Sequence, residues 1–234
     1  MRYLLFPSLI LGLLLAFRSP SEPRIASVVI DPATTPITMH WADDSGKALG
    51  NIGGLKAFVE SKGKHLRFAM NGGMYMEDLR PLGLYLEKGE QLRKLITKTD
   101  GYGNFYLQPN GVFGVDANRT AFVVTTTNYP KQKDVLFATQ SGPMLLVDGV
   151  INSAFKEGSV NVQIRNGVGI RPEGRVLFAI SKEPVNFYDF ARFFQQAGCT
   201  NALFLDGAIS RAYLPEQGLM QMDGRLGPLI AVVD

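Results

Sequence analysis

The sequence contains very few of the side chains on which many catalytic sites depend. Its 234 residues include one cysteine, Cys199, and two histidines, His40 and His65. A single cysteine cannot form a disulfide within the chain, and two isolated histidines argue against a thiol nucleophile, a Ser-His-Asp triad and a histidine-based metal centre. We therefore expect Cys199 to be a small buried apolar residue.

The sequence also lacks a strong excess of charge of one sign. Its formal net charge is +3, and lysine and arginine are scattered along the chain. No basic tract with interleaved aromatic residues is present, which is the pattern typical of nucleic-acid binding. We therefore expect no nucleic-acid partner.

No hydrophobic run is long enough for an ordinary membrane span, which needs about 20 residues. The apolar run at residues 4–17 follows Arg2 and is followed by the polar, proline-containing residues 18–23. This layout is typical of a secretory signal. We expect residues 1–23 to be a signal peptide or, if uncleaved, an N-terminal anchor that is the only contact with a membrane. Residues 24–234 would form one domain in the periplasm or outside the cell.

The remaining sequence has the pattern of a strand-rich domain with many turns. Residues 87–90, the pair Asp148-Gly149 and residues 171–174 have the composition of hairpin turns. Two helices are predicted, one from Ile52 to about Gly63 and one between the N-cap Asn186 and Gly198. The predicted strands cover residues 25–30, 37–41, 82–86, 92–96, 104–108, 112–115, 121–126, 144–147, 150–151, 168–170, 176–180, 202–205 and 229–233. The predicted fold class is a single α+β domain with a mixed, largely antiparallel sheet and a few packed helices.

Several predicted strands end or begin with a polar side chain followed by glycine. These motifs are Asn71-Gly72-Gly73, Asn110-Gly111, Gln140-Ser141-Gly142, Asn166-Gly167 and Asp206-Gly207. Glycine lets a ligand approach the backbone, and consecutive glycine N–H groups can form an anion-binding nest. Each motif alone is more often an ordinary turn. Together they predict one shared site.

The order and spacing of these motifs resemble the phosphodiester glycosidase family, in particular its small bacterial, exopolysaccharide-related branch. The residues that carry the resemblance are 68–75, 80–85, 104–113, 140–145, 164–169 and 205–207, within a match from about Asp31 to the C-terminus. The resemblance implies hydrolysis of a sugar-1-phosphodiester, with release of the sugar and a phosphomonoester. The expected partner is a sugar phosphate or phosphoglycan, no cofactor is expected, and a bound divalent metal is left open.

Two residues are the candidates for the chemistry. Asp206 ends the very apolar segment 202–205 and would act as nucleophile or as base for water. Arg165 would stabilise the negative charge of the departing phosphate with its planar guanidinium. The alternatives are an Asp-Gly turn and a structural ion pair. The candidate substrate-binding residues are Asn71, Gly72, Gly73, Asn110, Gly111, Gln140, Ser141, Gly142, Asn166 and Gly207.

Other groups and other functions stay open from the sequence. Glu77 and Asp78 could supply a second carboxylate, although solvated loop charges are the more common case. Tyr75, Tyr85, Phe105, Tyr106 and Tyr213 could stack on a sugar or lie in the core. The alternative function is a non-catalytic phosphoglycan-binding protein of polysaccharide assembly, and a third is an envelope scaffold without a ligand.

Overall fold

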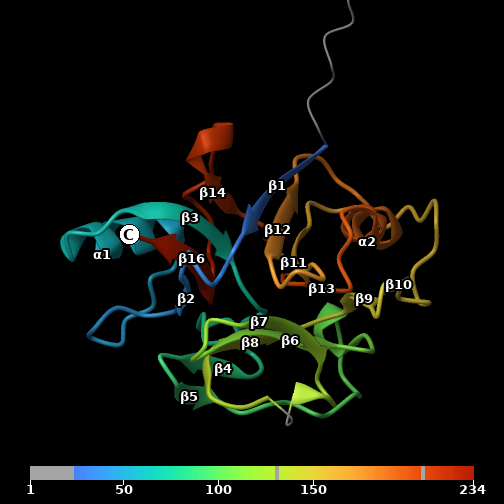
Figure 1. The fold of residues 1–234 in the computed structure, drawn as a ribbon, viewed down its shortest axis with the longest axis horizontal. Helices are drawn as coiled ribbons and strands as arrows, with labels where there is room; N and C mark the ends of the chain where they lie inside the picture. Colours follow the sequence, from blue (N-terminus) through green and yellow to red (C-terminus); the bar gives the residue numbers. More distant parts are fainter. Residues whose placement is uncertain (1–23, 130–131, 207–208) are drawn as a thin grey trace, which may run out of the picture.

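The computed structural model describes residues 24–129, 132–206 and 209–234. These residues form three sheets and two α-helices, with 13% helix and 38% strand (Figure 1). The prediction of a strand-rich α+β fold is confirmed. Every pairing between described strands is antiparallel, whereas a partly mixed sheet was expected.

The first sheet has six strands and carries the candidate catalytic residues at one edge. Its order is β1 (Ile25–Ile30), β12 (Val176–Ser181), β11 (Asn166–Ile170), β13 (Asn201–Phe204), β9 (Met144–Val147) and β10 (Val150–Ile151). Because β11 and β13 run antiparallel, the beginning of β11 and the end of β13 lie at the same edge of the sheet.

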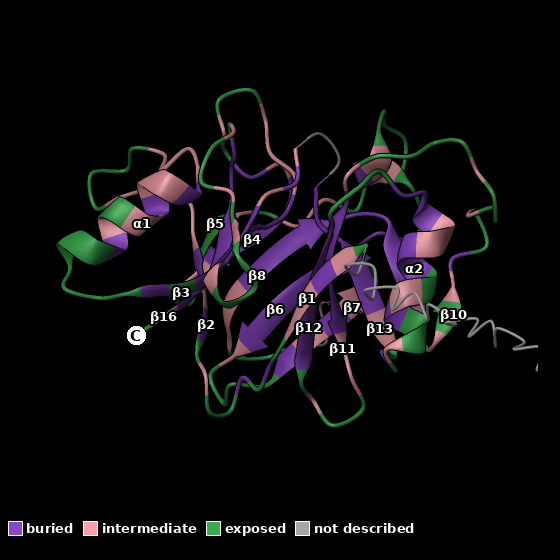
Figure 2. Ribbon diagram, turned by 90° about the horizontal axis from the view of Figure 1, so that it is seen from above, coloured by how far each residue is buried: buried purple, intermediate pink, exposed green. Residues whose placement is uncertain are grey.

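Two five-stranded sheets complete the domain. The second sheet has the order β15 (Leu219–Met220), β14 (Ala212–Leu214), β3 (Leu66–Asn71), β16 (Leu229–Val233) and β2 (Ile37–His40). The third has the order β5 (Glu90–Arg93), β4 (Tyr85–Glu87), β8 (Val135–Ser141), β6 (Gly111–Asp116) and β7 (Ala121–Thr125). Strands β6 and β8 are largely buried at the centre of the molecule (Figure 2).

Both helices begin as the sequence predicts. In α1 (Ile52–Ser61) the side chain of Asn51 accepts a hydrogen bond from the Gly54 N–H at 2.8 Å. In α2 (Phe187–Gln196) the side chain of Asn186 accepts from the Asp189 N–H, also at 2.8 Å. The apolar face of α1 packs with the second sheet, and that of α2 packs with the first. Among the described residues, no helix is long and apolar enough to cross a membrane.

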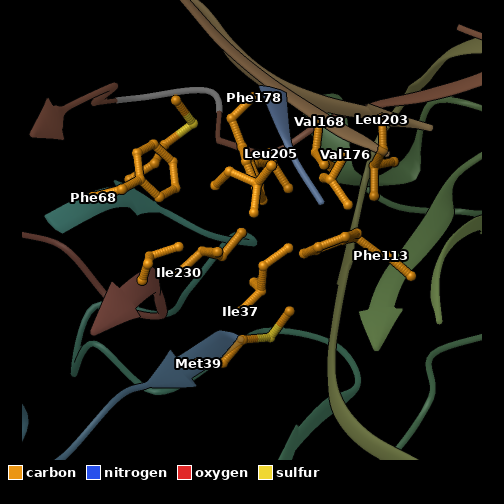
Figure 3. Packing of buried hydrophobic residues seen from close by; sticks show 14 of the residues in the cluster. Ile37, Met39, Phe68, Phe113, Val168, Val176, Phe178, Leu203, Leu205 and Ile230 are labelled. Atoms are coloured by element: carbon orange, nitrogen blue, oxygen red, sulfur yellow. The ribbon is translucent and has the colours of Figure 1, made fainter. Parts of the chain in front are cut away.

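All three sheets contribute side chains to one central hydrophobic core (Figure 3). Phe178 of β12 lies at the junction, with its ring centroid 4.9 Å from that of Phe68 on β3 and 5.6 Å from that of Phe113 on β6. Large apolar side chains at this separation gain both burial and favourable ring geometry. The core therefore holds together the sheets whose edges form the site.

Two of the predicted hairpin turns are confirmed, each with two consecutive residues at a positive φ. Asp148 and Gly149 have φ angles of 49° and 79° and join β9 to β10. Lys88 and Gly89, with φ angles of 53° and 83°, join β4 to β5 in the same way. Such left-handed pairs match the twist of a two-residue hairpin.

One predicted strand is wrong. Residues 104–108 read as a strand because they are rich in aromatic and apolar side chains, but the chain there forms a short 3₁₀ helix, η1 (Asn104–Tyr106). The side chain of Asn110 donates a hydrogen bond to the Phe105 carbonyl at 3.1 Å, and the Phe105 ring is buried. These contacts favour a turn over a strand at this position.

Cys199 is buried, as expected, and makes no disulfide. It packs among the side chains under α2. Burial raises the pKa of its thiol to about 11, so the reactive thiolate is scarce at neutral pH.

Candidate active site

Asp206 lies where strands of the first and second sheets converge. It follows the buried end of β13, and only 3% of its surface is exposed. Its carboxylate oxygen Oδ2 accepts a hydrogen bond from Asn71 Nδ2 at 2.9 Å, and its backbone N–H donates to Asn166 Oδ1 at 3.2 Å. Asn71 ends β3 and Asn166 begins β11. The motifs at residues 71, 166 and 206, distant in sequence, are therefore brought together as predicted.

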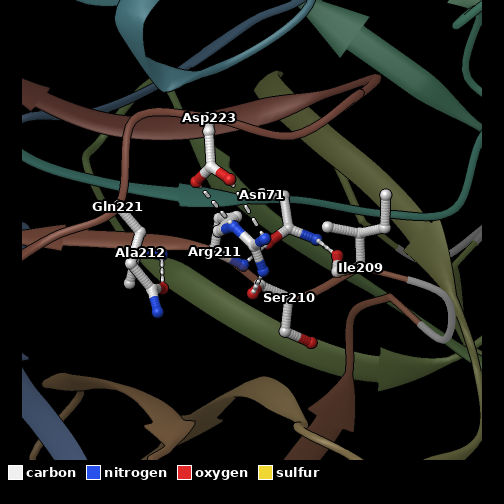
Figure 4. Close-up of polar contacts among 7 residues, drawn as sticks. All are labelled: Asn71, Ile209, Ser210, Arg211, Ala212, Gln221 and Asp223. Atoms are coloured by element: carbon white, nitrogen blue, oxygen red, sulfur yellow. Dashed lines mark hydrogen bonds and ion pairs between the residues drawn. The ribbon is translucent and has the colours of Figure 1, made fainter.

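Asn71 is the centre of this buried network. Figure 4 shows it beside two of its further partners, Ile209 and Arg211. Besides Asp206, its Nδ2 donates to the carbonyl of Ile209 at 2.7 Å. Its Oδ1 accepts from the N–H of Arg211 at 2.7 Å and from Nδ2 of Asn166 at 3.1 Å. Because the amide has four partners within the protein, its orientation is defined. Asn71 thus positions Asp206.

Two serines hold the backbone on either side of Asp206. Ser141, at the end of β8, donates its hydroxyl proton to the carbonyl of Leu205. The hydroxyl of Ser210 contacts Asn166 Oδ1 at 3.3 Å and the carbonyl of Ile164 at 3.2 Å. Three sheets therefore contribute to the position of one carboxylate, since β8 belongs to the third.

Asp206 opens into a pocket of about 290 Å³ with aromatic walls. The lining residues are Met74, Tyr75, Leu82, Tyr102, Gly103, Asn104, Phe105 and Asp206. Asp206 is the one carboxylate among them. Aromatic faces next to a carboxylate suit a sugar ring, whose C–H face stacks on an aromatic side chain while its reactive carbon meets the oxygen.

The hydroxyl group of Tyr75 is affected both by burial and by the nearby Asp206. Its hydroxyl donates to the backbone carbonyl of Arg225. Burial, with the negative charge of Asp206 as the second cause, raises the pKa of Tyr75 to about 12. The phenol is therefore neutral and a hydrogen-bond donor throughout the physiological range.

Arg165 lies on the other face of β11 from Asn166, because successive side chains of an extended chain alternate. Its guanidinium carbon is 3.6 Å from the centroid of the Phe187 ring. Nε donates to the carbonyl of Val185 at 2.8 Å, and Nη2 donates to that of Asn161 at 3.0 Å. Arg165 does not line the pocket of Asp206. The structure therefore does not bring the two candidate catalytic side chains together in one pocket.

Arg165 is nevertheless an unusual cation. Only 1% of its surface is exposed, and among the described residues no carboxylate lies within ion-pair distance of it. Burial lowers its pKa to about 10. Its partners Asn161 and Phe187 line a second hollow of about 220 Å³, and Asn104 lines both this hollow and the pocket of Asp206. We call the latter the Asp206 pocket.

Like Asn71 and Asn166, the predicted binding amides of Gln140 and Asn110 make hydrogen bonds inside the protein. Gln140 Oε1 accepts from the N–H groups of Leu84 at 3.1 Å and Ile96 at 3.0 Å. Its Nε2 donates to the Ile96 carbonyl at 2.7 Å and to Thr126 Oγ1 at 3.2 Å. Asn110 is buried and supports η1, as described above. Neither side chain lines the Asp206 pocket, but each holds a segment next to it.

The expectation of an anion nest at Gly72 and Gly73 is wrong. The Gly72 N–H donates to the Pro228 carbonyl at 2.7 Å, and the Gly73 N–H donates to Thr139 Oγ1 at 3.2 Å. At Gly73 the glycine is needed for packing, because a Cβ there would lie 2.2 Å from Thr139 Oγ1.

A side chain at the other predicted glycines would meet protein atoms. A Cβ on Gly111 would lie 2.3 Å from the sulfur of Met144, and one on Gly142 would lie 2.8 Å from Cβ of Asn110. Glycine is required at both positions for close packing. Gly207 lies outside the described residues.

The sequence did not single out several residues of the site. Tyr102 and Asn104 line the Asp206 pocket, and Ser210 holds its network. None belongs to a polar-glycine strand end, although Tyr102 lies between two glycines in a turn-rich stretch. Asp78 forms a local ion pair with Arg80 and does not line the pocket. Among the described residues, no cluster of three or more His, Cys, Asp or Glu is arranged to hold a metal ion.

The sequence and the fold are similar to those of known proteins. The sequence model of the phosphodiester glycosidase family matches residues 64–225. The chain is 38% identical over 197 residues to the uncharacterized protein YigE of Escherichia coli (strain K12), covering 83% of this chain and 76% of that protein.

Two solved structures share the fold. One is the catalytic domain of zebrafish N-acetylglucosamine-1-phosphodiester alpha-N-acetylglucosaminidase, auto-inhibited by its pro-peptide. It has a TM-score of 0.54 and 17% identity, and the match covers 92% of this chain and 85% of that one. The other is a hypothetical protein from Synechocystis, with a TM-score of 0.56 and 15% identity, covering 89% of this chain and 59% of that one. At these identities the likeness shows the fold alone, whereas the match of the sequence model shows the family. The chain belongs to the phosphodiester glycosidase family.

Proposed function

We propose that this protein is an exported hydrolase that cleaves a sugar-1-phosphodiester bond in an envelope or extracellular glycan, such as an exopolysaccharide. The products are the free sugar and a phosphomonoester. The observation that carries the proposal is Asp206, whose carboxylate is held by Asn71 and whose backbone is held by Asn166, in the lining of an aromatic-walled pocket. Membership of the family supports the same bond.

The proposed reaction requires one carboxylate and does not depend on a second one that acts as an acid. A phosphomonoester leaves as a stable anion, so its oxygen requires little protonation as the bond to the anomeric carbon breaks. Asp206 either attacks that carbon or takes the proton of the attacking water, and the water oxygen ends on the sugar. Asn71 directs the carboxylate through Oδ2.

The negative charge that develops on the phosphate needs a cation. Arg165 is the candidate because no described carboxylate lies within ion-pair distance of it and because its guanidinium stacks on Phe187, which lines the second hollow next to the Asp206 pocket. We call this second hollow the aglycone hollow, since the proposal places the alcohol part of the phosphodiester there. A buried guanidinium acts strongly on a nearby anion, since little water screens it. We assign the sugar to the Asp206 pocket and the phosphate to the side of Arg165.

The deciding experiment is hydrolysis of a panel of sugar-1-phosphodiesters, nucleotide sugars included, in ¹⁸O-labelled water. We expect the label on the free sugar, because the C–O bond breaks. Label on the phosphate would mean cleavage of a P–O bond and would overturn the proposed mechanism. Asp206→Asn should lower kcat by at least about 10³-fold, because it removes the positioned nucleophile or base.

The matched control is Asp44→Asn, which changes an exposed carboxylate paired with Lys62. It should retain wild-type activity. If the wild type binds these ligands without turnover, the protein is a phosphoglycan-binding protein and the hydrolase proposal fails.

A further inference from the structure

The aglycone hollow combines positive charge with apolar walls. It is lined by Asn104, Leu107, Ala154, Phe155, Lys156, Ser159, Asn161, Phe187 and Tyr188. We propose that it receives a phosphate that carries an alkyl chain, so that the substrates are sugar-1-phosphates esterified to a lipid-like alcohol. This inference deepens the proposed function and rests on it for the position of the sugar.

Three positive elements converge on the hollow. Lys156 lines it, and Arg165 stacks on Phe187 in its wall. Phe187 and Tyr188 are the first residues of α2, so the N-terminal end of that helix, which carries a partial positive charge, borders the same space. The neighbouring Glu157 is paired with Arg192 at 3.3 Å. Arg165 donates its hydrogen bonds to the carbonyls of Val185 and Asn161 and does not line the hollow, so it adds positive potential from behind the Phe187 ring. Lys156 is the cation that reaches the hollow itself.

The rim of the hollow is apolar and exposed to an unusual degree. Leu107, Val160 and Val162 are 41%, 95% and 42% exposed. Leu107 lines the hollow, and Val160 lies between the lining residues Ser159 and Asn161. Nine large hydrophobic side chains are exposed among the described residues, and these three either line the hollow or are sequence neighbours of residues that line it. We call them the apolar rim.

The polar groups of Asn161 and Ser159 in the hollow are already engaged in hydrogen bonds within the protein. The Asn161 carbonyl already accepts from Arg165, and its N–H donates to the hydroxyl of Ser159 at 3.3 Å. Phe155 and Phe187 stack at 4.9 Å between ring centroids, so a third planar group does not fit between them. An alkyl chain needs no hydrogen bonds and covers the apolar rim as it leaves the hollow.

The test compares ethyl, hexyl and decyl esters of glucose 1-phosphate and of N-acetylglucosamine 1-phosphate, below their micelle concentrations, with the corresponding nucleotide sugars. Each methylene that becomes buried contributes about fourfold in affinity. We expect kcat/KM to rise at least about tenfold from the ethyl to the decyl ester. The variant Leu107→Ser/Val160→Ser should lose most of this rise. The matched control Val150→Ser, at an exposed valine of β10 outside the hollow, should keep it.

Binding of ethyl and decyl phosphate, measured by calorimetry, gives a readout that needs no turnover. We expect the decyl compound to bind at least about tenfold more tightly, and the Leu107→Ser/Val160→Ser variant to lose the difference. Equal hydrolysis of all esters, a clear preference for nucleotide sugars, or a chain-length effect that survives in the variant would each overturn the inference while leaving the proposed function intact. Decyl phosphate that binds through the apolar rim, with no ester hydrolysed, would instead support the inference and refute the hydrolase.

Discussion

Gly73→Ala separates a packing role of the first glycine motif from a ligand-binding role. A Cβ added to Gly73 would lie 2.2 Å from Thr139 Oγ1 and 2.6 Å from the carbonyl oxygen of Gln140. Real Cβ atoms do not approach other atoms so closely, and the second contact is with backbone, so the turn has to move. Gly72 is the matched control, because a Cβ there would meet its nearest neighbours at 3.4 Å, an ordinary contact distance.

The expected loss of stability follows from these contacts. Overpacking of a rigid site costs about 1–3 kcal/mol. Displacement of the turn also weakens the hydrogen bond from the Gly73 N–H to Thr139 Oγ1, which contributes about 1 kcal/mol. The sum, about 2–4 kcal/mol, lowers the Tm of a domain of this size by about 4–16 °C. Gly72→Ala should change the free energy of unfolding by at most about 1 kcal/mol, since alanine also restricts the unfolded chain.

The assay is thermal and urea unfolding of both variants beside the wild type. Gly73→Ala should also reduce activity, because the displaced turn leads into Met74 and Tyr75 of the Asp206 pocket. Equal stability of the Gly73→Ala and Gly72→Ala variants would refute the reasoning. It would mean that the turn yields easily and that Gly73 is glycine for another reason.

Three further predictions concern single side chains. Gln140→Leu removes the hydrogen-bond partner of the Leu84 and Ile96 N–H groups and of the Ile96 carbonyl, so it should lower the free energy of unfolding by about 2–5 kcal/mol. A variant with wild-type stability and reduced activity would contradict this. Tyr75→Phe should leave the alkaline limb of the pH–rate profile unchanged up to pH 10, because the pKa of Tyr75 is raised to about 12; a shifted limb would show that the phenol titrates in the reaction. The pKa of His40 is lowered from 6.5 to about 4 by burial and by Lys88 and Lys64, so its contribution to stability is complete above pH 6.5 and is lost as the pH falls. The loss is about 3 kcal/mol by pH 4, and unfolding curves of His40→Gln should lack this part of the pH dependence.

The sequence by itself was sufficient for features that depend on a few neighbouring residues. Asp148-Gly149 forms a hairpin turn because both residues tolerate a positive φ. Asn186 caps α2 because its side chain reaches an N–H only three residues away. The meeting of Asn71, Asn166 and Asp206 was also predictable, since each polar side chain stands at the end of an apolar strand.

Only the tertiary structure decided what each polar side chain contacts. Asn71 and Asp206 are 135 positions apart, and whether an amide binds a carboxylate, a backbone segment or a ligand depends on which strands are neighbours. Gln140 has the sequence context of a binding residue, yet its four hydrogen bonds are all made inside the protein. Arg165 directly precedes Asn166, but alternation along the strand turns it towards Phe187 and the second hollow. Local chemistry therefore determined turns, caps and strand ends, whereas the pairing of strands determined which of those ends became a site.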